Sequence, residues 1–317
     1  SSTNHMFSGL NNLFKFSATG ILIFLLGSQV AKYREELLYL KEISAGQFFL
    51  ITIIVIASII TNGSKLKALA KLYNIHLKKR EVLCLSAITT TLNNFFFKAG
   101  SLFTSNYLKQ RYEFPFMSFA GSQGADHLII FFINALCGII ISLVFAASKK
   151  GPFIPLTVCY LSVVIFLLLI FSKTFDLQHR SNKFFNALIL AVNSLFRILK
   201  NKRLFYIFCA HNIVLVGLNT LRFFIICNIL ALNIPITYCL LFITLVPFIS
   251  AIPIIYSDIG TRELIIGMCS QWLGLGFETG MLVTLLDRCF VLIWASIISL
   301  SCRNLFAGIR IIPSTPH

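Results

Sequence analysis

Charged side chains are scarce in this chain. Asp, Glu, Lys and Arg make up 12% of the 317 residues, whereas hydrophobic residues make up 57% and the mean hydropathy is +0.85. A soluble domain carries about 25% charged residues, so this chain has too little charge to cover a surface that faces water. The composition argues against a soluble enzyme and predicts a membrane domain whose apolar side chains face lipid.

Acidic residues are the scarcest charged type, with 11 of them against 27 basic residues and a net charge of +16. Much of the basic excess lies in two stretches between apolar runs, 63–81 and 172–203. The first holds Lys65, Lys67, Lys71, Lys78, Lys79 and Arg80. Basic loops of this kind are typical of the cytoplasmic side of a membrane. We expect a multi-pass protein of a bacterial inner membrane with both termini in the cytoplasm, partnered by anionic lipid and by no nucleic acid.

Motifs for metal binding and for soluble catalysis are missing. The nine cysteines form no C-x-x-C pair, and no two histidines have the spacing of zinc ligands. The cysteines are therefore interpreted as small buried hydrophobic residues, and we expect no metal and no cofactor. The sequence also contains no H-E-x-x-H, G-x-S-x-G or P-loop motif. We expect a transporter-like protein rather than an enzyme, with an intramembrane transferase as an open alternative.

Long apolar runs are plentiful. A helix needs about 20 apolar residues to cross a bilayer, and the runs near that length are 13–31, 46–62, 117–147, 153–171, 204–231 and 279–301. Two further segments, 83–110 and 237–275, are interrupted by glycine or proline and predict re-entrant helical hairpins, because irregular backbone in a membrane must be covered by protein. The predicted fold class is an all-α integral membrane protein with about six transmembrane helices and two re-entrant broken hairpins.

The order span, broken hairpin, span occurs twice. Asp126-His127 follows Gly100 by 26 residues and Asp287-Arg288 follows Gly260 by 27, counted to the aspartate. The two sets begin on opposite sides of the membrane, so the pattern predicts an inverted repeat with its site between the halves. The predicted parts are a tag-like tail (1–12), membrane half 1 (13–171), a basic cytoplasmic linker (172–203), membrane half 2 (204–302) and a C-terminal tail (303–317). Within the linker, 183–199 is either an amphipathic surface helix or a plain linker helix.

Charges inside the predicted membrane segments are the candidates for function. A charge at the bilayer centre costs at least ~2.5–3.5 kcal/mol, so it usually has a partner or a ligand. The densest group is Ser257-Asp-Ile-Gly-Thr-Arg-Glu263. Gly260 permits a tight turn, the following helix N-terminus favours an anion, and the Arg262 guanidinium suits phosphate. The predicted head-group site comprises Arg262, Glu263, Asp258, Gly260, Asp287, Arg288, Lys98, Asn94, Arg222 and Asp126.

Each candidate also has a structural interpretation. The group at 257–263 is alternatively a salt bridge that pins the hairpin, in which Glu263 caps the helix or pairs with Arg262, Arg222 or Arg288. Asp287 and Arg288 are alternatively an internal ion pair, and Arg222 alternatively meets a carboxylate. Lys98 either attracts a phosphate or extends to the membrane interface.

Two stretches resemble the lysylphosphatidylglycerol synthase transmembrane-region family, which includes the flippase half of the multiple peptide resistance factor. They are 93–127 (N-N-F-F-F-K-A-G-S-L-F-T … G-A-D-H) and 245–288 (L-V-P-F … S-D-I-G-T-R-E-L … L-L-D-R). The resemblance implies a domain of broken helices that flips phospholipids or other lipid-linked head groups. Ser101, Thr104 and His127 stand where many members carry charge, so the first half-site is less charged. The soluble aminoacyl-transferase domain of longer members has no counterpart in this sequence, so we expect no aminoacylation.

These observations favour a lipid flippase or translocase for an anionic phospholipid or a polyprenyl-phosphate lipid. One alternative is an accessory membrane subunit that presents lipid to a partner glycosyl- or aminoacyl-transferase. Another is an intramembrane lipid transferase. A homodimer is compatible with each of these functions.

Overall fold

The computed structural model describes residues 43–95, 98–147, 153–173, 183–250 and 260–305, and this part of the chain is helical without strands. The α-helices are α2 (Ala45–Leu72), α3 (Lys79–Phe95), α4 (Ala99–Tyr112), α5 (Phe116–Ala147), α6 (Phe153–Ser172), α7 (Lys183–Lys200), α8 (Lys202–Ile229), α9 (Ile236–Ser250), α10 (Thr261–Trp272) and α11 (Phe277–Ser301), followed by a 3-10 turn (Arg303–Leu305). The predicted all-α class is confirmed. The expected span 13–31 lies outside the described residues.

Five of these helices, α2, α5, α6, α8 and α11, are long and apolar enough to cross a membrane. The most peripheral is α6, of which 22% of the apolar window is buried. It exposes large side chains, including Ile154 at 70% and Phe166 at 62%. Such a surface is unfavourable in water and favourable against lipid.

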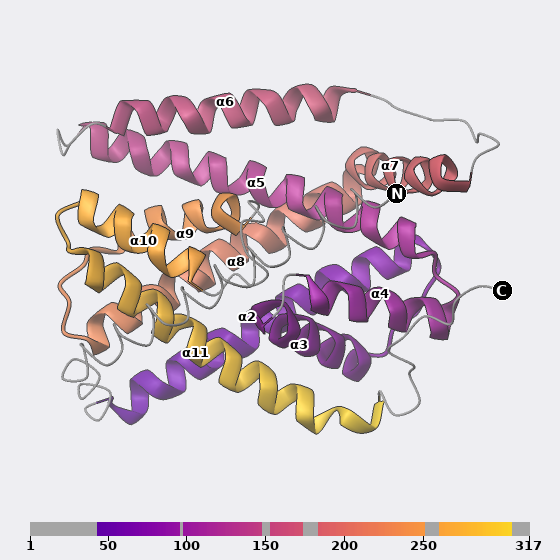
Figure 1. Cartoon of the computed structure of the whole chain (residues 1–317), viewed down its shortest axis with the longest axis horizontal. Coiled ribbons are helices and arrows are strands. Elements are labelled where there is room, and N and C mark those ends of the chain that lie inside the picture. Colours follow the sequence, from indigo (N-terminus) through magenta and orange to yellow (C-terminus); the bar gives the residue numbers. More distant parts are fainter. Residues whose placement is uncertain (1–42, 96–97, 148–152, 174–182, 251–259, 306–317) are drawn as a thin grey trace, which may run out of the picture.

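The helices α2–α5 and α8–α11 follow the same order and pack against each other reciprocally. The first helices of the two sets, α2 and α8, lie side by side; α3 packs against α11, and α9 packs against α5. In Figure 1 the pair α3–α4 lies towards one end of the long axis and the pair α9–α10 towards the opposite end. Each short helix pair is therefore held against a long helix of the other set, and the inverted repeat stays a prediction.

The α3–α4 hairpin closes tightly at Gly100. A Cβ atom at this position would lie 2.2 Å from the carbonyl oxygen of Thr89. The Asn93 side-chain oxygen accepts hydrogen bonds from the backbone N–H groups of Gly100 at 2.8 Å and Ser101 at 3.2 Å, so it caps the start of α4. The hydroxyl groups of Thr89 and Thr104 are 2.6 Å apart. The glycine thus permits a backbone approach that no other residue allows.

A buried carboxylate ties the other end of this hairpin together. Glu81, which is 2% exposed, accepts hydrogen bonds from the hydroxyl groups of Tyr107 and Tyr112, and the Arg111 Nε lies 3.8 Å away. The backbone N–H of Lys78 donates to the same carboxylate at 3.2 Å. The start of α3 is therefore joined to the end of α4.

The interpretation of 63–81 as one basic loop is wrong in its first half. Helix α2 continues to Leu72, and Lys65 on it is only 6% exposed. Gly63 does not break the helix because it packs against α3, with Val82 Cγ1 2.9 Å from where its Cβ would lie. The close approach of α3 covers this part of α2 and converts the expected loop into buried helix.

Helix α7 confirms the helix expected at 183–199 and packs along α5. At Gly121 an added Cβ would lie 1.9 Å from the carbonyl oxygen of Ala191. This backbone contact fixes where α7 crosses the first half.

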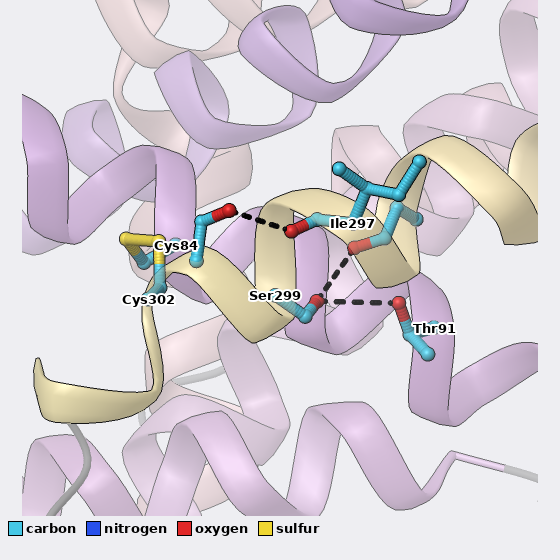
Figure 2. The surroundings of a disulfide bond; sticks show 7 residues. Cys84, Thr91, Ile297, Ser299 and Cys302 are labelled. Carbon is cyan, nitrogen blue, oxygen red and sulfur yellow. Dashed lines mark hydrogen bonds between the residues drawn. A yellow bond between two sulfur atoms is a disulfide. The ribbon is translucent and has the colours of Figure 1, made fainter.

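Two cysteines correct the view that all nine are small buried hydrophobic residues. Cys84 on α3 and Cys302 after α11 form a disulfide across 218 residues. Figure 2 shows this bond beside a hydrogen bond between the hydroxyl groups of Thr91 and Ser299, 3.3 Å long. The pairing has no local sequence signal because tertiary packing of α3 on α11 creates it. Cys159 and Cys289 are free and exposed, whereas Cys227 and Cys239 are buried as expected.

The Gly100→Ala variant tests the hairpin closure. The added methyl group meets backbone atoms of Thr89, so we expect a loss of about 1–3 kcal/mol in stability and a lower unfolding temperature in detergent. Gly217→Ala on α8 is the matched control, because no atom lies within 4 Å of its added Cβ and alanine favours a helix. Equal unfolding temperatures for wild type and Gly100→Ala would contradict the close approach.

Thiol counting tests the disulfide. Nine cysteines less the two in the disulfide leave seven thiols to react with a maleimide reagent in the denatured, unreduced protein. Reduction should raise the number to nine, and mass spectrometry reads both. The Cys84→Ser variant should show eight before and after reduction. Nine reactive thiols without reduction would rule out the bond in the protein as purified.

Candidate functional site

Two buried ion pairs occupy corresponding places in the two sets of helices. Lys65 on α2 lies 2.8 Å from Asp126 on α5, and Arg222 on α8 lies 2.5 Å from Asp287 on α11. All four residues are at most 9% exposed. Each pair joins the first long helix of its set to the last one. The two sets of helices therefore resemble each other in the position of one buried ion pair as well as in the order of their helices.

In the second set a further arginine, Arg262, joins the ion pair, so the described group has more positive than negative charge. Arg222 donates through Nε and Nη2 to the two oxygens of Asp287, and Arg262 at the start of α10 donates to the same carboxylate at 3.2 Å. Two guanidinium groups thus share one carboxylate, which is fully buried. The Arg262 Nε is also buried and has no hydrogen-bond partner among the described residues. Among the described residues, the cluster is therefore short of one negative charge and of one hydrogen-bond acceptor.

The pair in the first set is balanced. The Lys65 ammonium contacts both Asp126 and, at 3.0 Å, the side-chain oxygen of Asn212. Asn212 belongs to α8 and donates in turn to Asp126 at 3.3 Å. This triad fastens the two sets of helices together and carries no excess charge.

A third ion pair caps helix α10. Arg288 Nε lies 3.1 Å from Glu263, and Glu263 accepts a hydrogen bond of 2.8 Å from the backbone N–H of Gly260, whose φ is +94°. Glu263 therefore pairs with Arg288 among its three expected partners. Asp287 and Arg288 have different ion-pair partners, Arg222 and Arg262 for the one and Glu263 for the other, because consecutive residues of a helix point about 100° apart.

A cavity of about 260 Å³, here called the central cavity, lies beside these charges. Its wall carries Lys65, Arg222 and Arg262, and none of the described residues that line it is a carboxylate. Amide and hydroxyl groups complete the polar lining, from Ser58, Asn62, Thr90, Asn134, Asn212 and Asn219. The Asn134 Oδ1 is buried without a hydrogen-bond partner in the described chain. Apolar side chains make up the rest of the wall, and the charged groups among the described lining residues are all positive, so the cavity suits an anion.

Two further cavities continue from the central one. The tip cavity, about 270 Å³, shares Asn62, Lys65, Thr90 and Ile130 with it, and is lined by residues of both hairpin tips, Lys98 and Ser250 among them. The apolar cavity, about 480 Å³, adjoins the tip cavity and is lined by Leu102, Phe116, Phe119, Phe131 and Pro247 among others. The three cavities therefore share parts of their lining between the arginine cluster and the hairpin tips.

The structure brings together part of the predicted site. Arg222, Arg262 and Asp287 form one cluster, Asp126 and Lys98 line the tip cavity, and Gly260, Glu263 and Arg288 form the helix cap. The Asn94 amide instead bonds back to the Thr90 carbonyl at 2.8 Å, and Asn93 lines the cavity in its place. Asp258 lies outside the described residues.

Sequence reasoning missed Lys65 and Asn212. The signal for Lys65 was present, since Ile51, Val55, Ser58, Lys65 and Leu69 recur at helical spacing on the buried face of α2. Asn212 had no such signal, because its role depends on contact with another helix. Within the described residues no group of three His, Cys, Asp or Glu side chains could hold a metal ion.

Comparison with known proteins gives the family. The family model described as the lysylphosphatidylglycerol synthase TM region matches residues 13–299. The searches of curated proteins and of solved structures gave no match. With five long apolar helices, the protein is a multi-pass membrane protein with a lipid-related function. The family model covers most of the chain, and the protein therefore belongs to the lysylphosphatidylglycerol synthase transmembrane-region family.

Proposed function

We propose that this protein is a flippase that moves the head group of an anionic lipid between the leaflets of a bacterial inner membrane, with both termini in the cytoplasm. The observation that carries the proposal is the sharing of Asp287 by Arg222 and Arg262 at the wall of the central cavity. An uncompensated charge away from water is costly. A phosphate group in the cavity would neutralise it.

The hydrogen-bonding groups match a phosphate diester. Arg262 has an unused buried Nε donor, and guanidinium groups bind phosphate oxygens through paired N–H donors. The Lys65 ammonium approaches the same cavity from the other set of helices. A bound head group would therefore contact both halves at once.

The neighbouring apolar space supports an amphiphilic substrate. The apolar cavity adjoins the tip cavity through Ser101, His127 and Phe119. Lipid chains would remain in apolar surroundings while the head group passes through the central and tip cavities. A soluble anion has no apolar part that would bind in the apolar cavity.

Alternating access would come from movement of one half against the other. The halves pack through α2 on α8, α3 on α11 and α9 on α5, and beside the cavities Asn212 also bonds to Lys65 and Asp126. The Glu263–Arg288 pair keeps α10 on α11, so Arg262 would move with Asp287 as a unit. Neutralisation of this unit by phosphate would lower the cost of movement through the membrane.

Replacement of Arg262 by alanine tests the site. The change leaves Arg222 and Asp287 as a balanced pair, so the head group loses a charge-assisted hydrogen bond of about 1.5–3 kcal/mol. We expect phospholipid scrambling by the purified protein in liposomes to fall about ten- to a hundredfold, with partial recovery in Arg262→Lys. The matched control is Arg203→Ala, an exposed arginine at the start of α8.

The outcomes separate the functional classes. Scrambling that is unchanged in Arg262→Ala would contradict the site. Lipid binding without scrambling by folded wild type would replace the flippase by an accessory subunit that presents lipid to a transferase. A new covalent lipid product would replace it by an intramembrane transferase.

A further inference from the structure

The disulfide between Cys84 and Cys302 joins the two sets of helices. Cys84 lies on α3 of the first set, Cys302 directly follows α11 of the second, and their Cα atoms are 5.8 Å apart. Figure 2 shows the bond where these two helices meet, beside the hydrogen bond between Thr91 and Ser299. A disulfide keeps its Cα atoms no more than about 6.8 Å apart. While the bond is intact, these two points can therefore separate by only about 1 Å.

Helix α3 is fastened to α2 of its own set. The Ser86 hydroxyl donates to the carbonyl oxygen of Ile59 on α2 at 2.7 Å. At Gly63 of α2 an added Cβ would lie 2.9 Å from Val82 Cγ1 and 3.2 Å from the Val82 carbonyl oxygen. Close packing of this kind does not deform gradually, so any movement of the first set carries α3 with it.

Helix α11 is fastened to α8 and α10 of the second set. Its Asp287 pairs with Arg222 of α8, and its Arg288 pairs with Glu263 of α10 at 3.1 Å. These ion pairs are buried, and separation of their partners would leave charges uncompensated. Any movement of the second set therefore carries α11 with it.

The contact between α3 and α11 is thus a contact between two units. It adjoins the central cavity, whose wall includes Thr90 of α3 and Val291 of α11. If the disulfide is opened, side-chain packing and the 3.3 Å hydrogen bond between Thr91 and Ser299 remain across this contact. Packed helices can slide over such a contact by small steps, whereas a covalent bond prevents the sliding.

The proposed topology places this bond where reductants are present. Helix α11 leads to the C-terminus, which is proposed to lie in the cytoplasm. Cytoplasmic dithiols keep most cysteines reduced, and disulfides found there are usually transient, catalytic or redox-sensing. Cys302 is 6% exposed and Cys84 is fully buried. A thiolate of a dithiol reductant would therefore attack the Cys302 Sγ and expel the Cys84 thiolate.

The exchange then balances in one further step. The second thiol of the reductant displaces Cys302 from the mixed disulfide. Two electrons pass from the dithiol to the protein, both protein thiolates take up a proton, and the reductant leaves as its own disulfide. Oxidation by a disulfide donor follows the same steps in reverse.

We infer that the Cys84–Cys302 bond is a redox-controlled lock between the two halves. In the oxidised protein it holds α3 on α11 and stops the movement that carries a head group through the central cavity. Reduction to two thiols by a cytoplasmic dithiol releases that movement. The inference rests on the proposed function and adds regulation to it.

Scrambling by the full-length protein in liposomes tests the lock. We expect wild type to scramble phospholipid about tenfold or more faster after treatment with dithiothreitol than after oxidation with diamide, because the restrained movement limits the rate. The Cys84→Ser variant should scramble at the faster rate after either treatment. Cys159→Ser, which removes an exposed free thiol, is the matched control and should respond as wild type does.

A disulfide at the neighbouring contact separates locking from local effects at Cys84. The hydroxyl groups of Thr91 and Ser299 are 3.3 Å apart, and Thr91 lies about 10 Å from Cys84 along α3. The triple variant Cys84→Ser, Thr91→Cys, Ser299→Cys therefore moves the covalent link along the same pair of helices. It should again scramble slowly when oxidised and fast when reduced, with formation of the new bond read by mass spectrometry.

Hydrogen exchange measures the release without transport. Reduction of wild type should speed amide exchange along α3 as far as Thr90 and Asn93 at the cavities, because this helix is no longer held on α11. The peripheral helix α6 is the internal reference and should not change. In growing cells, trapping of thiols with a maleimide before lysis should find Cys84 and Cys302 mostly reduced, and disulfide stress should oxidise them.

Each result has a distinct meaning. Equal scrambling by oxidised and reduced wild type, or fast scrambling by the oxidised triple variant with its new bond formed, would refute the lock and leave the flippase proposal standing. A bond that stays oxidised in growing cells would refute its control by cytoplasmic dithiols. If the folded protein scrambles no lipid in either state, the proposed function fails. Exchange then decides the lock, which faster exchange along α3 supports and unchanged exchange refutes.

Discussion

The need to compensate buried charge governs this structure. Lys65, Asp126, Arg222 and Asp287 sit at most 9% exposed among helices whose outer surfaces suit lipid. Charges in such surroundings are tolerated only with close partners. Each pair therefore ties the first long helix of one half to the last, and Asn212 extends the first pair to the other half. Members of both pairs, Lys65, Asp126 and Arg222, also form part of the cavity walls.

The two halves use this arrangement unequally. Among the described residues of the second half, three cations and two carboxylates meet around α10, which leaves one positive charge beside the central cavity. In the first half one balanced pair remains, and Ser101 and His127 leave space beside it. The same order of helices thus carries an excess of described positive charge in one half and a balanced ion pair in the other.

Packing of small residues positions the same groups. Gly100 lets α4 approach α3 until an added Cβ would meet a carbonyl oxygen, and Gly280 does the same between α11 and α10, with Ile266 O at 2.7 Å. These approaches bring the α4 and α10 N-termini, with Ser101 and Arg262, to the interior. Close helix packing through small residues is a common basis for association in membranes. The disulfide between Cys84 and Cys302 adds a covalent link between α3 and the end of α11.

The sequence by itself determined the all-α membrane class, the long apolar helices, the breaks near Lys98 and Gly260, and the isolated charges of Arg222, Arg262 and Asp287 within apolar segments. These follow from local properties, since hydropathy, run length, glycine and isolated charges can be read along the chain. Only the tertiary structure decided that Lys65 is a buried partner of Asp126, that Arg288 pairs with Glu263 rather than with its neighbour, and that Cys84 meets Cys302. Such pairings depend on which faces of distant helices meet, and hydropathy along the sequence contains no information about those contacts.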